Sequence, residues 1–278
     1  MIVCALGYGY LSKYVFRRIC GLGVTAIGIT SKQINDYGFR NSFFVSRENI
    51  KKTLSFSTHL LITAPPNSKG CIIFNNFSDK VLNSNVKSII YISSTGIYGN
   101  HNGNWVDEKS LIKANSPFDK IRLKAEKQWK KFCSNYNINL NIVRIAGIYG
   151  PHRLININEK ELIVVLKRNH YFSRIHILDA ARLVSKIILE NHKDEVWNLA
   201  DDLPSSREAF LSEVIKAKKI TKFSTISYEK YSKTMSERSK KFWINNKRVS
   251  NNKIKDHFEY KFIFPNYING IRNLKEYL

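Results

Sequence analysis

Short apolar runs alternate with longer amphipathic stretches through the first two thirds of the 278-residue chain. The runs do not alternate regularly with polar residues, which is typical of strands covered on both faces of a sheet. They are Met1–Leu6, Val24–Thr30, His59–Ala64, Ser88–Ser93 and Asn139–Ile145. The stretches between them, such as Leu11–Leu22 and Phe118–Tyr136, predict helices. Strands and helices in this alternation predict an α/β fold with a doubly wound parallel sheet.

The pattern becomes irregular after Pro151, although Val196–Leu199 still reads as a late strand. We therefore expect a main domain over residues 1–150 together with about 176–202. The remaining segments, 151–175 and 203–278, predict a smaller, discontinuous lobe.

Two helix starts are marked by their own residues. Ser116 can cap the helix at Phe118, and Pro117 fits the first helical position, where no N–H is required. Ser205 and Glu208 have the spacing of a capping box, which predicts a second start.

The segment Gly7-Tyr8-Gly9-Tyr10-Leu11-Ser12 directly follows the first predicted strand and opens a helix. The first glycine permits a tight turn, the second lets the backbone approach a pyrophosphate, and the helix start supplies N–H groups. Serine stands where a third glycine is usual, and it is small enough to keep helix and strand close. The segment predicts a dinucleotide site formed by Gly7, Gly9, Tyr10, Leu11 and Ser12. The alternative is an ordinary glycine turn in a protein that binds no nucleotide.

The end of the second strand decides which dinucleotide is expected. An acidic residue there would bind the ribose 2′-hydroxyl of NAD. This chain has Thr30-Ser31-Lys32 instead, and no carboxylate until Asp36. Because a hydroxyl and a cation suit a 2′-phosphate, Ser31 and Lys32 predict NADP in preference to NAD. The alternative is that Lys32 is one more exposed lysine.

Further motifs follow in a fixed order. They are Tyr91–Gly99 with Trp105–Glu108, Val143–Pro151, Arg174–Asp179 with Val196–Asp202, and finally Lys247–Asn251 and Phe264–Tyr267. With these motifs the chain resembles the atypical branch of the extended short-chain dehydrogenase/reductases, the group that contains nucleotide-sugar epimerases and dehydratases. The resemblance implies a Rossmann sheet, a small C-terminal substrate lobe, and hydride transfer between a nicotinamide cofactor and a small-molecule substrate. It is compatible with a monomer or a homodimer.

The resemblance also assigns expected site residues. By motif position Ser94 matches the family's catalytic Ser/Thr, whose hydroxyl would bond the reacting oxygen. The loop with Ala64 and Pro65 follows a strand at the carboxyl edge of the sheet, where ligands bind in such folds. Ser93 and Ala146 are expected in the same cofactor pocket. In the substrate lobe, Arg174 is expected to face an anionic substrate.

The family's Tyr-x-x-x-Lys pair is replaced by Phe118 and Arg122. In that pair the tyrosine transfers the proton. The lysine, one helical turn later, lowers the pKa of the tyrosine. Phenylalanine cannot donate or accept a proton, and Arg122 retains only the positive charge, which could hold the nicotinamide ribose. Tyr98 is the nearest phenol in the sequence and a candidate substitute. The alternative, which we favour, is that Tyr98 packs beneath the cofactor loop. Two more residues match motif positions. Arg144 lies in a predicted strand and is expected to be a member of a structural ion pair. His176 lies in an apolar stretch and is expected to be a core histidine.

The chain carries 45 Lys and Arg against 22 Asp and Glu, a formal net charge of +23. Such a charge attracts polyanions. The lysines are dispersed, however, and the chain is rich in Asn and Ile, so we favour a compositional drift over a nucleic-acid interface. We expect only weak, salt-sensitive nucleic-acid binding without sequence preference.

The cysteines and histidines form no metal-binding spacing, so we expect buried thiols and no metal. No apolar run reaches the roughly 18 residues that a membrane span needs. The opening run Met1–Leu6 lacks a preceding basic region and reads as a strand, not as a signal peptide. These features predict a cytoplasmic protein that is not in a membrane.

Three functions follow from this reading. The first is an NADP-dependent oxidoreductase or epimerase/dehydratase-like enzyme with an unusual catalytic apparatus. The second is a non-catalytic dinucleotide-binding sensor or assembly protein, which the missing tyrosine favours. The third, RNA binding, rests on the charge and on residues 238–248, where cations flank Phe242 and Trp243.

Overall fold

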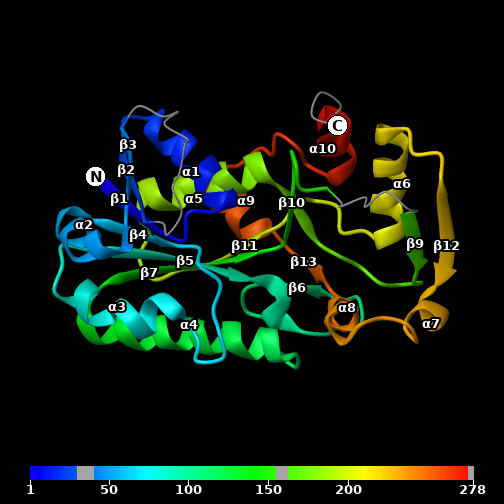
Figure 1. The fold of residues 1–278 in the computed structure, drawn as a ribbon, viewed down its shortest axis with the longest axis horizontal. Helices are drawn as coiled ribbons and strands as arrows, with labels where there is room; N and C mark the ends of the chain where they lie inside the picture. Colours follow the sequence, from blue (N-terminus) through cyan, green and yellow to red (C-terminus); the bar gives the residue numbers. More distant parts are fainter. Residues whose placement is uncertain (30–40, 155–161, 275–278) are drawn as a thin grey trace. The chain divides into compact units, whose positions relative to one another are not determined.

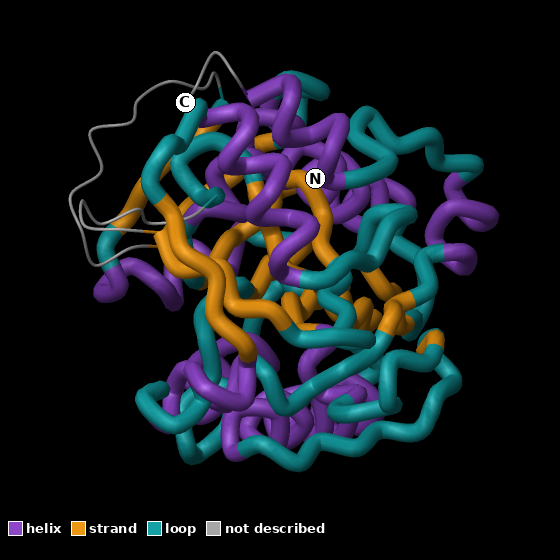
Figure 2. The backbone as a smooth tube through the Cα atoms, turned by 90° about the vertical axis from the view of Figure 1, so that its right-hand side faces the viewer, coloured by secondary structure: helices purple, strands orange, loops and turns teal. Residues whose placement is uncertain are grey.

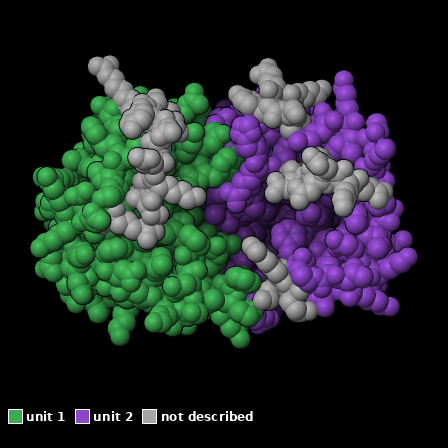
Figure 3. Space-filling model, viewed as in Figure 1, with its two compact units in different colours: residues 1–94, 117–144, 180–197 green, residues 95–116, 145–179, 198–278 purple. Residues whose placement is uncertain are grey.

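The computed structural model describes residues 1–29, 41–154 and 162–274 (Figure 1). The chain divides into two compact units, which Figure 3 shows in different colours. Unit 1 comprises Met1–Ser94, Pro117–Arg144 and Ala180–Trp197, and unit 2 comprises Thr95–Ser116, Ile145–Asp179 and Asn198–Leu278. Residues 95–116, which the sequence analysis assigns to the first domain, thus belong to unit 2.

A seven-stranded sheet has the strand order β11-β7-β5-β4-β1-β2-β3. Its strands are β1 (Ile2–Leu6), β2 (Thr25–Ile29), β3 (Ser42–Val45), β4 (His59–Ile62), β5 (Ser88–Ser94), β7 (Asn139–Ile145) and β11 (Val196–Leu199). The pairs β1/β2, β1/β4, β2/β3 and β4/β5 are parallel. The order leads away from β1 in both directions, so the sheet is doubly wound. The predicted fold class is confirmed.

Helices cover both faces of this sheet (Figure 2). They are α1 (Tyr10–Cys20), α2 (Ile50–Phe56), α3 (Ile72–Leu82), α4 (Pro117–Tyr136) and α5 (Ile177–Glu190), with a 3-10 turn η1 (Arg47–Asn49). Figure 1 shows α3 and α4 on one face and α1 and α5 on the other. Because both faces are covered, all residues of β4 and nearly all of β5 are buried.

Aromatic rings close the core beneath α4. Trp129 is fully buried and meets Phe74 of α3 edge to face, with ring centroids 5.1 Å apart. Phe132, one turn further along α4, packs edge to face against both rings. This geometry is a favoured one for aromatic pairs and fixes α4 against α3.

A buried ion pair joins α4 to the sheet. Arg144 of β7 holds Glu126 of α4 through two bonds, Nη2 to Oε2 at 2.9 Å and Nε to Oε1 at 3.3 Å. The side chains are only 3% and 2% exposed. Arg144 is thus the structural ion-pair member that the sequence analysis expected.

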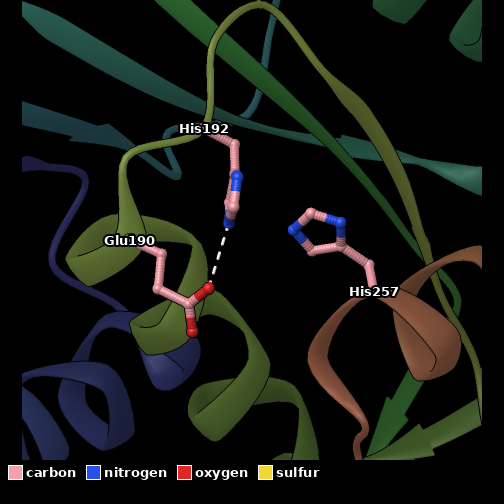
Figure 4. Close-up of side chains that lie close together, drawn as sticks. All are labelled: Glu190, His192 and His257. Atoms are coloured by element: carbon pink, nitrogen blue, oxygen red, sulfur yellow. Dashed lines mark hydrogen bonds and ion pairs between the residues drawn. The ribbon is translucent and has the colours of Figure 1, made fainter.

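Polar contacts fix the turn between α5 and β11. His192 Nε2 lies 3.0 Å from Glu190 Oε2 at the end of α5 (Figure 4). The Asn139 side chain at the start of β7 donates to the His192 carbonyl at 2.7 Å. Asp194 Oδ1 accepts from the Leu140 N–H at 2.9 Å. The turn is therefore positioned by its hydrogen bonds to β7.

Unit 2 contains three two-stranded parallel pairs. They are β6 (Trp105–Val106) with β13 (Arg248–Val249), β8 (Gly147–Tyr149) with β10 (Arg174–His176), and β9 (Leu162–Leu166) with β12 (Phe223–Ser227). The helices are η2 (Thr95–Tyr98), α6 (Arg207–Lys218), α7 (Tyr228–Tyr231), α8 (Glu237–Phe242), α9 (Asn252–Phe258) and α10 (Tyr267–Asn273). A core of Tyr149, Phe210, Leu211, Tyr267 and Ile271 joins α6, α10 and β8.

One buried carboxylate fastens the C-terminal part of unit 2. Asp179 is 0% exposed, and its Oδ1 accepts from the Tyr260 hydroxyl and the Ile263 N–H, each at 2.8 Å. Its Oδ2 accepts from the Phe264 N–H at 2.9 Å. These charge-assisted bonds hold the segment before α10 in place.

The two marked helix starts have different outcomes. Pro117 is the first residue of α4, as expected. The capping box at Ser205 is wrong by one residue, because Ser206 is the N-cap of α6 and its hydroxyl accepts from the Ala209 N–H. Ser205 Oγ instead accepts a bond from Arg174 at 2.8 Å, a tertiary contact that competes with capping.

All four cysteines are buried free thiols, which agrees with the expectation from their spacing. Among the described residues, no helix is both long enough and apolar enough to cross a membrane.

The Glu126–Arg144 pair gives a stability prediction. Arg144→Met should lower the free energy of unfolding by about 3–5 kcal/mol, because it leaves a buried carboxylate without its partner. The matched control is Lys186→Met, which breaks the exposed i, i+4 pair with Glu190 and should cost less than about 1 kcal/mol. Urea unfolding of both variants measures the difference. Equal small losses would contradict a structural role for the buried pair.

Candidate functional site

The turn between β1 and α1 is shaped by a close contact between two backbones. Gly7 has φ +103°, and a Cβ placed on it would lie 2.5 Å from the Ala64 nitrogen. The Leu6 carbonyl accepts from the N–H groups of Thr63 and Ala64 at 3.1 and 3.2 Å, which draws the two loops together. Only glycine satisfies both the dihedral angle and the space at position 7.

Two hydroxyl groups reinforce this contact. Ser12 is fully buried, and its Oγ lies 3.1 Å from the Gly7 carbonyl and 2.9 Å from Thr63 Oγ1. Thr63 Oγ1 is also hydrogen-bonded to the Gly7 carbonyl. Serine at the third glycine position therefore ties the turn to the loop after β4. The small size of Ser12 can be read from the sequence, whereas its bond to Thr63 is visible only in the fold.

The N-terminus of α1 is open to a ligand. Gly9 is the N-cap residue, and no side chain caps the helix. Within the described part of the chain, a Cβ on Gly9 would come within 4 Å only of the Gly7 carbonyl, at 3.9 Å. The first turn, which begins at Tyr10 and Leu11, contains no acidic residue. Uncapped N–H groups and the helix dipole at such a position suit an anion, and the open space at Gly9 fits a pyrophosphate.

The loops after β1, β4 and β5 lie at one edge, because these strands are parallel neighbours in the sheet. Ala64 and Pro65 after β4, and Ser93 and Ser94 at the end of β5, therefore lie at the same edge as the glycine turn. Ser93 is 1% exposed, and its Oγ has no hydrogen-bond partner within the described part of the chain. A buried hydroxyl of this kind at the carboxyl edge fits a ligand that supplies the missing bond.

The positions of the absent Tyr-x-x-x-Lys pair lie at the start of α4. Phe118 is 54% exposed, and Arg122 is half-buried one turn later. Burial raises the pKa of the Tyr91 phenol on β5 above its usual value, and the Arg122 guanidinium offsets part of the rise. The Arg122 charge therefore acts on groups inside unit 1. Tyr91, whose hydroxyl has no partner among the described side chains and backbone groups, was missed by the sequence analysis.

In unit 2, Tyr98 is fully buried. Its hydroxyl donates to Asn198 Oδ1 at 2.8 Å, and its ring packs with Ala146 and Val249. These contacts are those of a packing residue, the alternative that the sequence analysis favoured for Tyr98.

Arg174 and His176 are both buried on β10. Arg174 is 8% exposed and donates to the Phe172 carbonyl at 3.0 Å and to Ser205, while its guanidinium stacks 4.4 Å from the Phe210 ring centroid. His176 Nδ1 accepts from the Leu178 N–H, and burial lowers its pKa to about 4. His176 is thus a neutral core histidine at pH 7.

Two sequence hypotheses concern other segments. Ser31 and Lys32, on which the NADP preference depends, lie outside the described residues. In the segment considered for RNA stacking, Phe242 is exposed but Trp243 is 5% exposed and packs against His170 and Tyr228. The expectation that both aromatics are available to stack bases is wrong for Trp243, because it belongs to a local hydrophobic core.

Residues 71–200 match the model of the NAD dependent epimerase/dehydratase family. No curated protein sequence gives a match. One similar solved structure is a functionally unknown conserved protein from Silicibacter pomeroyi, with 25% identity, a TM-score of 0.89, and coverage of 99% of this chain and 98% of that one. UDP-N-acetylglucosamine 4-epimerase from Bacillus cereus has 17% identity and a TM-score of 0.78 over 99% of this chain and 98% of its own. UDP-glucuronic acid 4-epimerase from Bacillus cereus, in complex with NAD, has 16% identity and a TM-score of 0.79 over 100% of this chain and 96% of its own. Over residues 71–200 this chain is thus similar to the NAD dependent epimerase/dehydratase family, and it shares the fold of these solved structures.

Proposed function

We propose that this protein binds a nicotinamide dinucleotide at the Gly7–Ser12 turn and acts on a small molecule as an oxidoreductase or epimerase-like enzyme. The observation that carries the proposal is the uncapped N-terminus of α1, where Gly9 leaves open space directly after β1. A pyrophosphate placed there would accept N–H bonds from the helix start. The complex of the related UDP-glucuronic acid 4-epimerase with NAD supports the same ligand class.

The cofactor in this proposal is NADP in preference to NAD, because Ser31 and Lys32 stand where an acidic residue would bind a free 2′-hydroxyl. The protein is proposed to work in the cytoplasm as a monomer or homodimer. Its substrate is a small molecule, and nucleic acid binds only through non-specific phosphate contacts.

In this proposal the cofactor and individual residues of the chain have separate roles in the reaction. A bound nicotinamide supplies or accepts a hydride. Ser94 would donate a hydrogen bond to the reacting carbonyl oxygen, and Arg122 would hold positive charge near the cofactor ribose. Phe118 cannot move a proton, so this work falls to a substrate group, to water or to another phenol. We infer a slow reaction on ordinary carbonyl compounds.

A second candidate is a non-catalytic dinucleotide-binding protein, such as a redox sensor or an assembly protein. Two observations favour it: Phe118 occupies the position of the family's proton donor, and the Tyr98 hydroxyl is already bonded to Asn198. Cofactor binding without turnover would support this candidate, whereas steady turnover would support the enzyme.

The first test separates binding from folding. Gly9→Val places a side chain where the pyrophosphate would lie, so NADPH binding, followed by nucleotide fluorescence, should be lost while the melting temperature stays close to that of the wild type. Gly7→Ala should lower stability as well, by about 1–3 kcal/mol, because position 7 has φ +103° and its Cβ would meet Ala64. Undiminished NADPH binding by a folded Gly9→Val variant would refute the proposed site.

The second test concerns the choice of cofactor. The purified protein should bind NADPH more tightly than NADH, and Ser31→Asp should erase or reverse the preference, because a carboxylate repels the 2′-phosphate. Titrations of both nucleotides at moderate salt measure the ratio. Equal wild-type affinities would show that the NADP assignment is wrong while leaving the dinucleotide site in place.

The third test restores the missing proton path. General acid/base catalysis typically contributes about 10²–10⁴-fold, so Phe118→Tyr with Arg122→Lys should raise NADPH oxidation on a panel of aldehydes and ketones within that range. Ser94→Ala in this double variant should remove the gain, because the carbonyl loses its donor. Rapid wild-type turnover that survives both Tyr98→Phe and Ser94→Ala would place the chemistry elsewhere.

A further inference from the structure

Helix α4 presents a row of lysines at the surface of unit 1. The row lies along a shallow groove of about 450 Å³, which is lined by Lys120, Leu123, Lys124, Lys127, Gln128 and Lys131. All four lysines are exposed. At about 100° and 1.5 Å per residue, they share a sector of about 60° and form a row about 16 Å long. They therefore make one strip of positive charge, the lysine strip, on the face of the sheet opposite α1 and α5 (Figure 1).

The other side of α4 faces the core and holds the acidic residues of the helix. Trp129 is fully buried, and Glu126 is 1% exposed and paired with Arg144. Asp119, the other carboxyl of α4, is 6% exposed. Arg122 lies on this inner side, about 180° around the helix from the lysines. The lysine strip thus receives no exposed carboxylate from its own helix and faces away from the part of α4 assigned to the cofactor.

The lysines of the strip are not neutralised by neighbours. Within the described part of the chain, none of the four pairs with a carboxylate or hydrogen-bonds to another residue. Lysines of α5, α6 and α9 do have carboxylate partners, in Glu190, Glu213 and Asp202. Like charges three and four residues apart on a helix repel one another and lower its stability. The strip therefore retains a charge that a bound anion would compensate.

One wall of the groove is fixed by Gln128. Its Oε1 accepts from the Cys71 N–H at 2.8 Å, while its Nε2 donates to Asn75 Oδ1 at 2.9 Å and to the Lys69 carbonyl at 3.4 Å. These bonds hold the segment before α3 beside α4, where Lys69, also exposed, adds a further cation. They also occupy both N–H donors of the amide. Gln128 thus shapes the groove and has no donor left for the edge of a base.

The dimensions and charge of the strip select its occupant. A row of about 16 Å is longer than one phosphate or carboxylate, whereas a nucleic acid carries regularly spaced phosphates along its backbone. Lysine is depleted at protein–protein interfaces, and a helix that lies on a lipid surface buries an apolar face. Among the described residues that line the groove, Leu123 alone is apolar. Charge complementarity therefore favours a nucleic acid over an acidic protein and over a membrane.

We propose that the lysine strip of α4 binds the phosphate backbone of a nucleic acid without reading its sequence. The ammonium groups of the four lysines contact phosphates along the row. Leu123 and the aliphatic stems of the lysines form the floor against which the sugars lie. The proposal gives a location to the non-specific phosphate contacts named above, and it does not depend on the dinucleotide site.

The test is fluorescence anisotropy of the full-length protein with labelled oligo(dT) and with a mixed-sequence duplex over a series of salt concentrations. Each neutralised phosphate contributes about 0.9 to the slope of log affinity against log salt for a duplex and about 0.7 for a single strand. The variant that replaces all four lysines by glutamine should therefore lose about 3 from this slope and bind at least about tenfold more weakly at low salt. Both probes should be affected, because no base is read.

The matched control replaces four exposed lysines outside α4 by glutamine, namely Lys51, Lys109, Lys193 and Lys222. It loses the same charge as the strip variant and should keep most of the wild-type affinity and slope. The strip variant should melt no lower than the wild type, because repulsion within α4 is relieved while its buried side is unchanged. Circular dichroism measures the melting temperature, and NADPH titration of both variants reports on the dinucleotide site separately.

Three results would overturn the proposal. The first is that the wild type binds neither probe at low salt. The second is an equal loss of affinity in the strip variant and the control, which would mean that dispersed charge alone attracts the nucleic acid. The third is that the wild type sediments with phosphatidylserine vesicles through the strip while it ignores both oligonucleotides, which would identify a lipid surface as the occupant.

Discussion

The approach of the Gly7 backbone to that of Ala64 is the constraint on which the candidate cofactor edge depends. Position 7 needs both a left-handed dihedral angle and the absence of a side chain. Where the two loops touch, the hydroxyls of Ser12 and Thr63 bond to the Gly7 carbonyl and so fix the turn from which α1 begins. The helix start is thereby left open at Gly9. A single close contact therefore fixes the position of the proposed anion site.

The fold could be predicted from the sequence because its determinants are local. The six expected strands are all present, since unbroken apolar runs have few alternatives to a sheet covered on both faces. The strand β3 (Ser42–Val45) was missed, because its residues are only partly buried and its apolar run is short. The one-residue error at Ser205 has a tertiary cause. Arg174 comes from a distant segment and binds this hydroxyl, and no local pattern contains that partner.

The site was predictable in part. The glycine turn could be read directly, but the Ser12–Thr63 contact joins residues 51 positions apart in the chain and depends on the pairing of β1 with β4. The same holds for Arg122, whose charge offsets part of the rise in the Tyr91 pKa only when α4 packs on β5. The charge of +23 was the least informative feature. A composition cannot show that basic side chains gather on one face of α4.

The interleaving of the two units along the chain has a consequence for biosynthesis. Unit 1 receives its last segment at Trp197, so its sheet can close while much of unit 2 is still being translated. Unit 2 cannot close at that stage, because Asp179 obtains its partners only from Tyr260, Ile263 and Phe264. Unit 2 is therefore expected to complete its folding after unit 1.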